Sequence, residues 1–238
     1  MNTGTIIDAA AAGAPSRAAL IIDGHHISYA GLATAARQCA AGLTAHGIGA
    51  GDRVAVVDSG SLLSIATVLG AARIGAVAAL MNPALTPPEL RGLIKNSNCA
   101  DVAVAGEPYI GRLREAGAAT VLSESDLFAE PSPTFSADIT DTPDDGDALI
   151  LFTSGTTGLP KPIAISNGRL SMRIEGMARP FRADAQPAVG MMSVPFFHVG
   201  GALGILGSLY AGNTAVVQKR FDAGEWLRLV SENGVTTT

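Results

Sequence analysis

Short apolar runs alternate with segments of helical periodicity along most of the chain. Such runs are typical of strands that are covered on both faces of a sheet. The expected strands are residues 19–23, 53–57, 76–80, 101–105, 149–152, 163–165, 189–194 and 214–217. Residues 234–238, at the end of the chain, look like the beginning of one more strand.

Helices are expected between these runs. The clearest, residues 29–46, has its apolar residues at helical spacing and is followed by Gly47, a common stop signal. Another begins after Thr86, where Pro87 suits the first helical position and Glu89 can reach back to cap it. The remaining expected helices are residues 61–74, 170–177, 199–210 and 223–233. This alternation predicts an α/β fold, layered α/β/α, with largely parallel sheets.

One stretch interrupts the alternation. Residues 123–147 contain eight acidic residues and no Lys or Arg. A block of like charge is most simply a solvated connector. We therefore predict an α/β subdomain at residues 1–122, an acidic linker at 123–147, and a second, incomplete α/β subdomain at 148–238.

Composition excludes several classes of protein. With 47% hydrophobic and 16% charged residues, most of the chain is not disordered. A net charge of −5 leaves no basic field to hold nucleic acid. The two cysteines are far apart in the sequence, which fits neither a disulfide framework nor a zinc site and favours a reducing, cytoplasmic location. No apolar run approaches the roughly 20 residues of a transmembrane helix, and the first 20 residues lack a signal peptide pattern.

The segment with the clearest chemistry is the loop at residues 153–161, which follows an apolar run. It contains four hydroxyl side chains, two glycines and one lysine. Glycines let backbone N–H groups approach a polyanion, hydroxyls donate to its oxygens, and the lysine adds positive charge. The loop therefore predicts a phosphate site. The alternative interpretation is a solvent-exposed loop that binds no ligand. It is not a Walker A loop, because prolines flank Lys161 on both sides.

This loop, Thr153-Ser154-Gly155-Thr156-Thr157-Gly158-Leu159-Pro160-Lys161, resembles the phosphate-loop signature of the adenylate-forming superfamily. That superfamily contains acyl-CoA and aryl-CoA synthetases, luciferases and adenylation domains. Residues 51–56 and 69–83 are similar to the N-terminal region of the family, and residues 194–201 resemble its aromatic-plus-histidine motif. The resemblance covers essentially the whole chain, but only the first part of a family member.

The resemblance implies an AMP-forming acid–thiol ligase. A carboxylate attacks the α-phosphate of Mg–ATP, which gives an acyl-adenylate and pyrophosphate, and a thiol then takes the acyl group. The implied cofactors are ATP, Mg²⁺ and coenzyme A, although the thiol is not fixed by any residue. The implied substrate is a small carboxylic acid, fatty or aryl, which suggests a role such as fatty acid metabolism. Neither nucleic acid nor a membrane is an expected partner, and a homo-oligomer stays open.

The family motif assigns roles residue by residue. The residues expected to hold the β- and γ-phosphates are Thr153, Ser154, Gly155, Thr156, Thr157, Gly158 and Lys161. His198 matches the histidine near the acyl site and the α-phosphate, and is the expected catalytic residue. No metal ligand is assigned, since the family's magnesium-binding glutamate would lie beyond Thr238.

Departures from the pattern leave alternatives. Pro162 replaces the usual glycine and should stiffen the lysine end of the loop. Because the later motifs of the family are absent, we expect a truncated chain that is inactive alone and prone to self-association. A stand-alone phosphate-binding module and a non-catalytic remnant both stay open. The glycines that follow His198 provide either space for an acyl chain or close packing.

Overall fold

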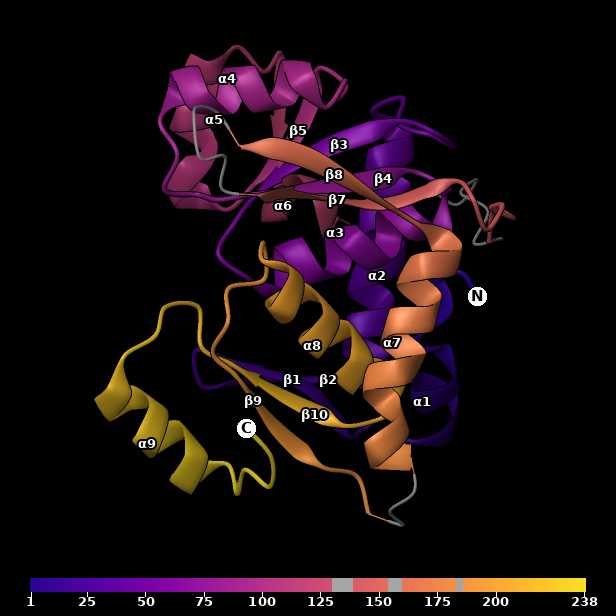
Figure 1. Cartoon of the computed structure of the whole chain (residues 1–238), viewed down its shortest axis with the longest axis vertical. Helices are drawn as coiled ribbons and strands as arrows, with labels where there is room; N and C mark the ends of the chain where they lie inside the picture. Colours follow the sequence, from indigo (N-terminus) through magenta and orange to yellow (C-terminus); the bar gives the residue numbers. More distant parts are fainter. Residues whose placement is uncertain (130–138, 154–159, 183–185) are drawn as a thin grey trace.

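The computed structural model describes residues 1–129, 139–153, 160–182 and 186–238, with only the backbone described at residues 179–182. It contains two sheets, with helices between them and on their outer faces (Figure 1). The strand order is β6-β5-β3-β4-β7-β8 in the larger sheet and β2-β1-β10-β9 in the smaller.

The six-stranded sheet is mainly parallel. Its strands are β3 (Arg53–Val57), β4 (Val77–Met81), β5 (Val102–Ala105), β6 (Thr120–Leu122), β7 (Asp147–Thr153) and β8 (Lys161–Ser166). The neighbours from β6 to β7 are parallel, whereas β7 and β8 are antiparallel. Helices cover both faces of the central strands, and this is why β3 and β4 are apolar along almost their whole length.

The four-stranded sheet joins distant parts of the chain. Its strands are β1 (Ala18–Ile22), β2 (His25–Ser28), β9 (Val189–Met192) and β10 (Thr214–Val217). β10 pairs in parallel with both β1 and β9. β1 and β2 form a hairpin whose two turn residues, Asp23 and Gly24, have φ of 50° and 77°, as a tight primed turn requires.

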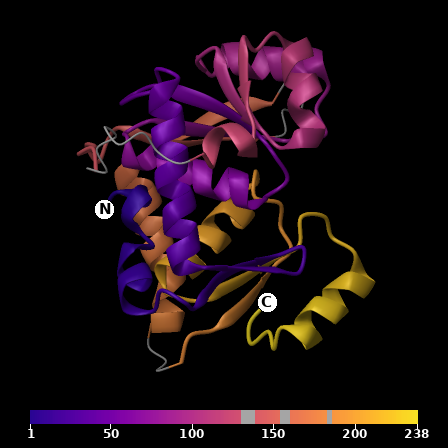
Figure 2. The ribbon, with the colours of Figure 1, turned by 180° about the vertical axis from the view of Figure 1, so that it is seen from behind.

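The helices form three layers. The outer layer on the larger sheet is α4 (Pro87–Asn96) and α5 (Ile110–Ala116), and α9 (Ala223–Glu232) lies on the outer face of the smaller sheet. The layer between the sheets contains α2 (Tyr29–Ala45), α3 (Leu62–Arg73), α7 (Asn167–Arg182) and α8 (Val199–Tyr210). The shorter helices are η1 (Thr3–Thr5), α1 (Asp8–Gly13), η2 (Glu107–Tyr109) and α6 (Glu124–Leu127). Seen from behind, the long helix α2, in indigo, runs between the two sheets (Figure 2).

Alternation along the strands decides which layer each side chain joins. In β3, Val54 and Val56 pack in the middle layer, whereas Ala55 and Val57 pack against α4 and α5. In β1, Ile21 faces α9 while its neighbours face the middle layer. Both faces of β3 and β1 are therefore apolar because each face packs against its own helix layer.

The predicted fold class, α/β with helix and sheet layers and largely parallel sheets, is confirmed. The observed β3, α8 and β10 have the predicted bounds, α2 ends one residue earlier than predicted, and α4 begins directly after Thr86, as predicted. The elements that were not predicted are η1, α1, β2, η2, α5, β6 and α6. His25 and His26 are exposed residues of β2, and Trp226 of α9 is half-buried and donates to Ser193 Oγ at 2.9 Å.

Both sheets contain strands from each side of the acidic stretch. β7 and β8 complete the larger sheet, and β1 and β2 belong to the sheet that contains β9 and β10. The described part of residues 123–147 includes α6, where Leu127 packs against Gly42 of α2. The division into units at 1–122 and 148–238 stays a prediction. Within the described ranges, no helix is both long enough and apolar enough to cross a bilayer.

Candidate functional site

One edge of the larger sheet collects the segments that carry the predicted chemistry. Parallel strands end at the same edge, so the residues that follow them are brought together. Asp58 follows β3, Asn82 follows β4, Gly106 follows β5, and residues 154–159 follow β7. The chain passes from β3 to β4 on one side and then crosses to β5 on the other. Open α/β sheets bind ligands at this edge, near such a reversal of strand order.

Thr153 and Lys161 face each other at the end of the β7–β8 hairpin. They are register partners, and Thr153 Oγ1 donates to Lys161 O at 3.5 Å. Lys161 is exposed, and none of the ion pairs among the described residues involves it. The ammonium group is therefore available to a ligand. The other predicted phosphate-binding residues, Ser154, Gly155, Thr156, Thr157 and Gly158, lie outside the described residues.

Pro162 is accommodated by its place at the rim of the sheet. It pairs with Phe152, and β8 is the edge strand. An edge strand tolerates proline because one side of it makes no ladder hydrogen bonds. The hairpin therefore forms despite the departure from the family pattern, and the expected stiffening of the lysine end stays a prediction.

His198 is the N-cap residue of α8. Its backbone N–H donates to Pro195 O at 2.9 Å, and its carbonyl accepts from the N–H of Ala202 at 2.9 Å. The imidazole does not cap the helix; it is exposed and lies 4.5 Å from the ring of Phe197, centroid to centroid. The backbone hydrogen bonds thus fix the position of His198, and its side chain does not take part in capping the helix.

Phe196 packs this turn onto the carboxyl edge of the sheet. Phe196 is 2% exposed, and a Cβ added at Gly60 would lie 3.1 Å from its Cβ. Gly60 follows β3 by three residues, so the turn before α8 contacts the loop after β3. A single strand, β4, separates β3 from β7. At the usual strand spacing β3 and β7 are about 10 Å apart, so His198 and the hairpin end lie at the same edge.

Asp58 holds the loop that receives Phe196. Its Oδ2 accepts from the N–H of Gly60 at 3.1 Å and of Ser61 at 2.7 Å, and the side chain is buried. A Cβ at Gly106 would lie 2.6 Å from Asp58 Oδ1, so a larger residue there would have to displace this carboxylate. Sequence analysis did not single out Asp58; the signal was an Asp-Ser-Gly-Ser segment directly after a strand, which is typical of an Asx turn.

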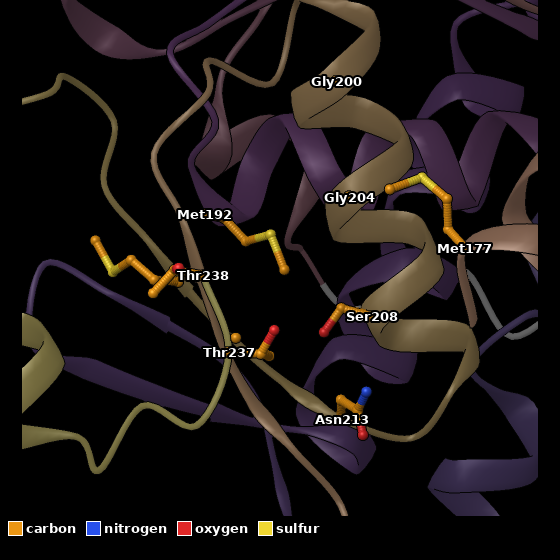
Figure 3. Close-up of a pocket in the computed structure, with 10 residues that line it drawn as sticks. Met177, Met192, Gly200, Gly204, Ser208, Asn213, Thr237 and Thr238 are labelled. Carbon is orange, nitrogen blue, oxygen red and sulfur yellow. The ribbon is translucent and has the colours of Figure 1, made fainter. Parts of the chain in front are cut away.

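A cavity of about 240 Å³ lies between α8 and β9 (Figure 3). The residues that line it are Met177, Gly190, Met191, Met192, Gly200, Gly204, Ser208, Asn213, Thr237 and Thr238. Gly200, Gly204 and Ser208 are four residues apart and therefore share one face of α8. This face begins two residues after His198, which is itself not among the lining residues.

The glycines of α8 differ in their surroundings. A Cβ at Gly204 would have Met192 Sδ as its nearest neighbour, at 3.3 Å, so this glycine faces the flexible end of a side chain at the wall of the cavity. A Cβ at Gly201 would overlap the carbonyl oxygens of Val194 and Pro195, so this glycine permits close packing of the turn. Close packing is therefore the role of Gly201, and space for an acyl chain beside Gly204 stays a prediction.

The described residues include potential metal ligands and two thiols. Among the described residues there is no cluster of three or more His, Cys, Asp or Glu side chains placed to hold a metal ion. Cys39 and Cys99 are free thiols, and burial raises the pKa of each to about 12. At neutral pH they are therefore protonated and weakly nucleophilic.

Comparison with known proteins was made by sequence and by structure. A family model described as AMP-binding enzyme matches residues 7–238. The chain is 28% identical to the fatty acid–[acyl-carrier-protein] ligase ScoC of Streptomyces coeruleorubidus, over 94% of this chain and 44% of ScoC. It is 31% identical to 4-coumarate–CoA ligase 5 of Oryza sativa subsp. japonica, over 92% of this chain and 43% of that protein. The chain therefore spans less than half the length of these relatives.

Among solved structures, the chain resembles o-succinylbenzoate CoA synthetase (MenE) from Bacillus subtilis in complex with its acyl-adenylate intermediate. The TM-score is 0.86 at 23% identity, over 98% of this chain and 47% of that chain. A structure of the same enzyme with ATP and magnesium ion gives a TM-score of 0.83 at 21% identity, over 98% of this chain and 62% of that chain. At these identities the likeness shows the fold.

Proposed function

Because the chain belongs to the AMP-binding enzyme family, we propose that it supplies the amino-terminal part of an AMP-forming ligase that joins a carboxylic acid to a thiol. In the first half-reaction a carboxylate oxygen attacks the α-phosphate of ATP, and the bond to pyrophosphate breaks. In the second, a thiol attacks the acyl carbon and AMP leaves.

The observation that carries this proposal is the packing of Phe196 against Gly60. It supports a single site in which His198 and the end of the β7–β8 hairpin act on one substrate, although 37 residues separate Lys161 from His198 (198 − 161). Neither motif alone would distinguish a ligase from a phosphate-binding loop.

In this proposal the hairpin end binds the leaving group. Lys161 is exposed and outside the described ion pairs, and Thr153 is its register partner. A cation and hydroxyl donors aimed at pyrophosphate stabilise the charge that develops as it leaves, so they favour the transition state over the ground state. Ser154, Gly155, Thr156, Thr157 and Gly158 stay proposed partners of the same phosphates.

The start of α8 is the proposed binding place of the reacting carboxyl group and the α-phosphate. The first N–H groups of a helix lack intrahelical partners and form its positive end, which favours anions. His198 lies at this end, with its ring exposed. It is the proposed catalytic residue, in contact with the carboxyl group or the α-phosphate.

The cavity along α8 is the proposed site of the rest of the acid. Its wall is mostly glycine and methionine, which suits an apolar body. The relatives include ligases of a fatty acid and of 4-coumarate, so a fatty and an aryl acid are both candidates. Coenzyme A is the proposed thiol, and acyl carrier protein, which ScoC uses by its name, is the alternative.

Magnesium would accompany ATP and neutralise its phosphates, and we assign none of the described residues to hold it.

The two free thiols fit the proposed cytoplasmic location.

Acid-dependent exchange of pyrophosphate into ATP tests the first half-reaction. The complete encoded polypeptide, whether it ends at Thr238 or continues, is assayed with a panel of fatty and aryl acids. We expect exchange with at least one acid, and a loss of about 100-fold in Lys161→Ala, because a transition-state donor is removed. Lys95→Ala, an exposed lysine on α4, is the matched control and should retain the rate.

Three outcomes separate the candidate functions. ATP binding without exchange for any acid would favour a phosphate-binding module. Neither binding nor exchange would favour a non-catalytic remnant. Equal rates for the Lys161→Ala and Lys95→Ala variants would contradict the role of the hairpin.

A further inference from the structure

We propose that the cavity between α8 and β9 selects carboxylic acids that carry a neutral oxygen at the end remote from the reacting carboxyl group. Ser208 and Asn213 form the polar end that would recognise this oxygen (Figure 3). The inference rests on the proposed function, because it assumes that the carboxyl group lies near His198.

Ser208 has a buried hydroxyl that finds no partner in the described part of the chain. The residue is 6% exposed, and its Oγ makes no hydrogen bond to any described residue. A serine within a helix often bonds the carbonyl four residues earlier, yet Ser208 does not use that of Gly204. Its hydroxyl instead points into the cavity, toward Thr237 (Figure 3). Since a buried polar group without a partner is costly, a ligand atom at this place would be stabilising.

Asn213 presents an amino group to the same place. It is 2% exposed, its Oδ1 accepts from the N–H of Ala188 at 2.9 Å, and its backbone carbonyl accepts from Tyr29 Oη at 2.6 Å. With the amide oxygen occupied in this way, Nδ2 is turned toward Ser208 (Figure 3). An amide nitrogen only donates, so this end of the cavity calls for an acceptor.

The two ends of the cavity are separated along α8. Gly200 and Ser208 are eight residues apart (208 − 200), which corresponds to about 12 Å at the rise of an α-helix. Between them the wall is formed by Gly204, Met177 and Met192. An acid with its carboxyl group at the start of α8 therefore passes apolar wall before its far end reaches Ser208.

The chemistry of the lining favours one class of far end. A hydrocarbon end would leave the Ser208 hydroxyl buried and unpaired, and sites with buried polar groups discriminate strongly against ligands that cannot bond them. A second carboxylate would be buried without a counter-charge, since the lining contains no Lys or Arg. A hydroxyl, ether or carbonyl oxygen satisfies the donors without either cost.

Two pairs of acids test the selection, each differing only by a terminal hydroxyl group. They are 3-phenylpropanoic and 3-(4-hydroxyphenyl)propanoic acid, and octanoic and 8-hydroxyoctanoic acid. Calorimetric titration of the 238-residue chain gives the dissociation constants. We expect the hydroxylated member of at least one pair to bind about tenfold tighter, as one added buried hydrogen bond would produce.

Ser208→Ala identifies the source of the preference. It should reduce the tenfold difference to about twofold by weakening only the hydroxylated acid. Ser64→Ala is the matched control, because Ser64 is a buried helical serine of α3 whose hydroxyl has a partner, Ser61 O at 3.1 Å. That variant should keep the full preference.

The outcomes distinguish a failure of the proposed selectivity from a failure of the proposed acid-binding site. If both members of each pair bind equally, or if the preference survives Ser208→Ala, the selection is wrong while the acid site stands. If no acid binds to the cavity, the proposed acid site fails and the selection fails with it.

Discussion

Two helices of the middle layer carry small residues, yet the space beside them differs. A Cβ at Gly70 of α3 would lie 2.7 Å from Ala36 O and 2.8 Å from Ala40 N, both backbone atoms of α2. At Gly204 of α8 the nearest atom would be Met192 Sδ, at 3.3 Å, beside a cavity. A small residue thus permits close packing where a backbone approaches, and leaves room for a ligand where only flexible side chains do.

The serines of the two helices repeat the contrast. The hydroxyl of Ser64 in α3 donates to Ser61 O, whereas that of Ser208 in α8 has no partner among the described residues. In α3 a local hydrogen bond completes the packing. In α8 the cavity and the Ser208 hydroxyl are both available to the proposed acid. A core helix such as α3 has neither free space nor an unpaired hydroxyl at the corresponding positions.

The largest effect is expected from Gly70→Ala. The added methyl group would press on the backbone of α2, and overpacking of a core typically costs about 1–3 kcal/mol, with a backbone obstacle at the upper end. We expect a loss of about 2–3 kcal/mol in the free energy of unfolding, measured by urea denaturation.

Gly204→Ala is the matched control for that variant. Its methyl group meets only Met192 Sδ, and alanine is about 1 kcal/mol better than glycine within a helix. Stability should therefore be unchanged or slightly higher, while acid binding weakens. Equal destabilisation by the two variants would remove the contrast between α3 and α8.

A smaller effect is expected from the serines. Ser64→Ala should lower the free energy of unfolding by about 1 kcal/mol, because it removes a hydrogen bond. Ser208→Ala should leave stability unchanged or raise it, because it removes a buried hydroxyl that has no described partner. Thermal unfolding of both variants checks the sign. A clear loss in Ser208→Ala would mean that its hydroxyl already has a structural partner.

The smallest signal is expected from cysteine labelling. Cys39 of α2 lies against Gly70, and burial raises the pKa of its thiol to about 12. At pH 8 almost no thiolate is present, so a thiol reagent should label neither Cys39 nor Cys99 until denaturant is added. Rapid labelling of Cys39 in the native protein would show that the α2–α3 interface opens readily.

The framework of the fold could be predicted from the sequence where apolar periodicity is strong. β3 and α8 were predicted with the observed bounds because burial on both faces leaves a clear apolar pattern. β2 was missed since His25 and His26 have no such pattern, and only pairing with β1 makes this segment a strand. In α5 only two residues are buried, too few to give a period.

The candidate site divides in the same way. Lys161 and His198 were found through local motifs, and the structure adds the packing of Phe196 that brings their segments to one edge. Ser208 and Asn213 could not be predicted as site residues, because the sequence does not show which face of α8 lies beside a cavity. Only the segments that pack against α8 decide which of its glycines contact a backbone and which line the cavity.

The central claim is that the acid binds between α8 and β9, and methionine methyl NMR tests it most directly. With ¹³C-methyl methionine in the chain, addition of a binding acid should shift Met177 and Met192, which line the cavity. Met81, fully buried on the α4 face of the larger sheet, should stay in place. Acid binding that shifts Met81 and leaves Met177 and Met192 unchanged would contradict the account.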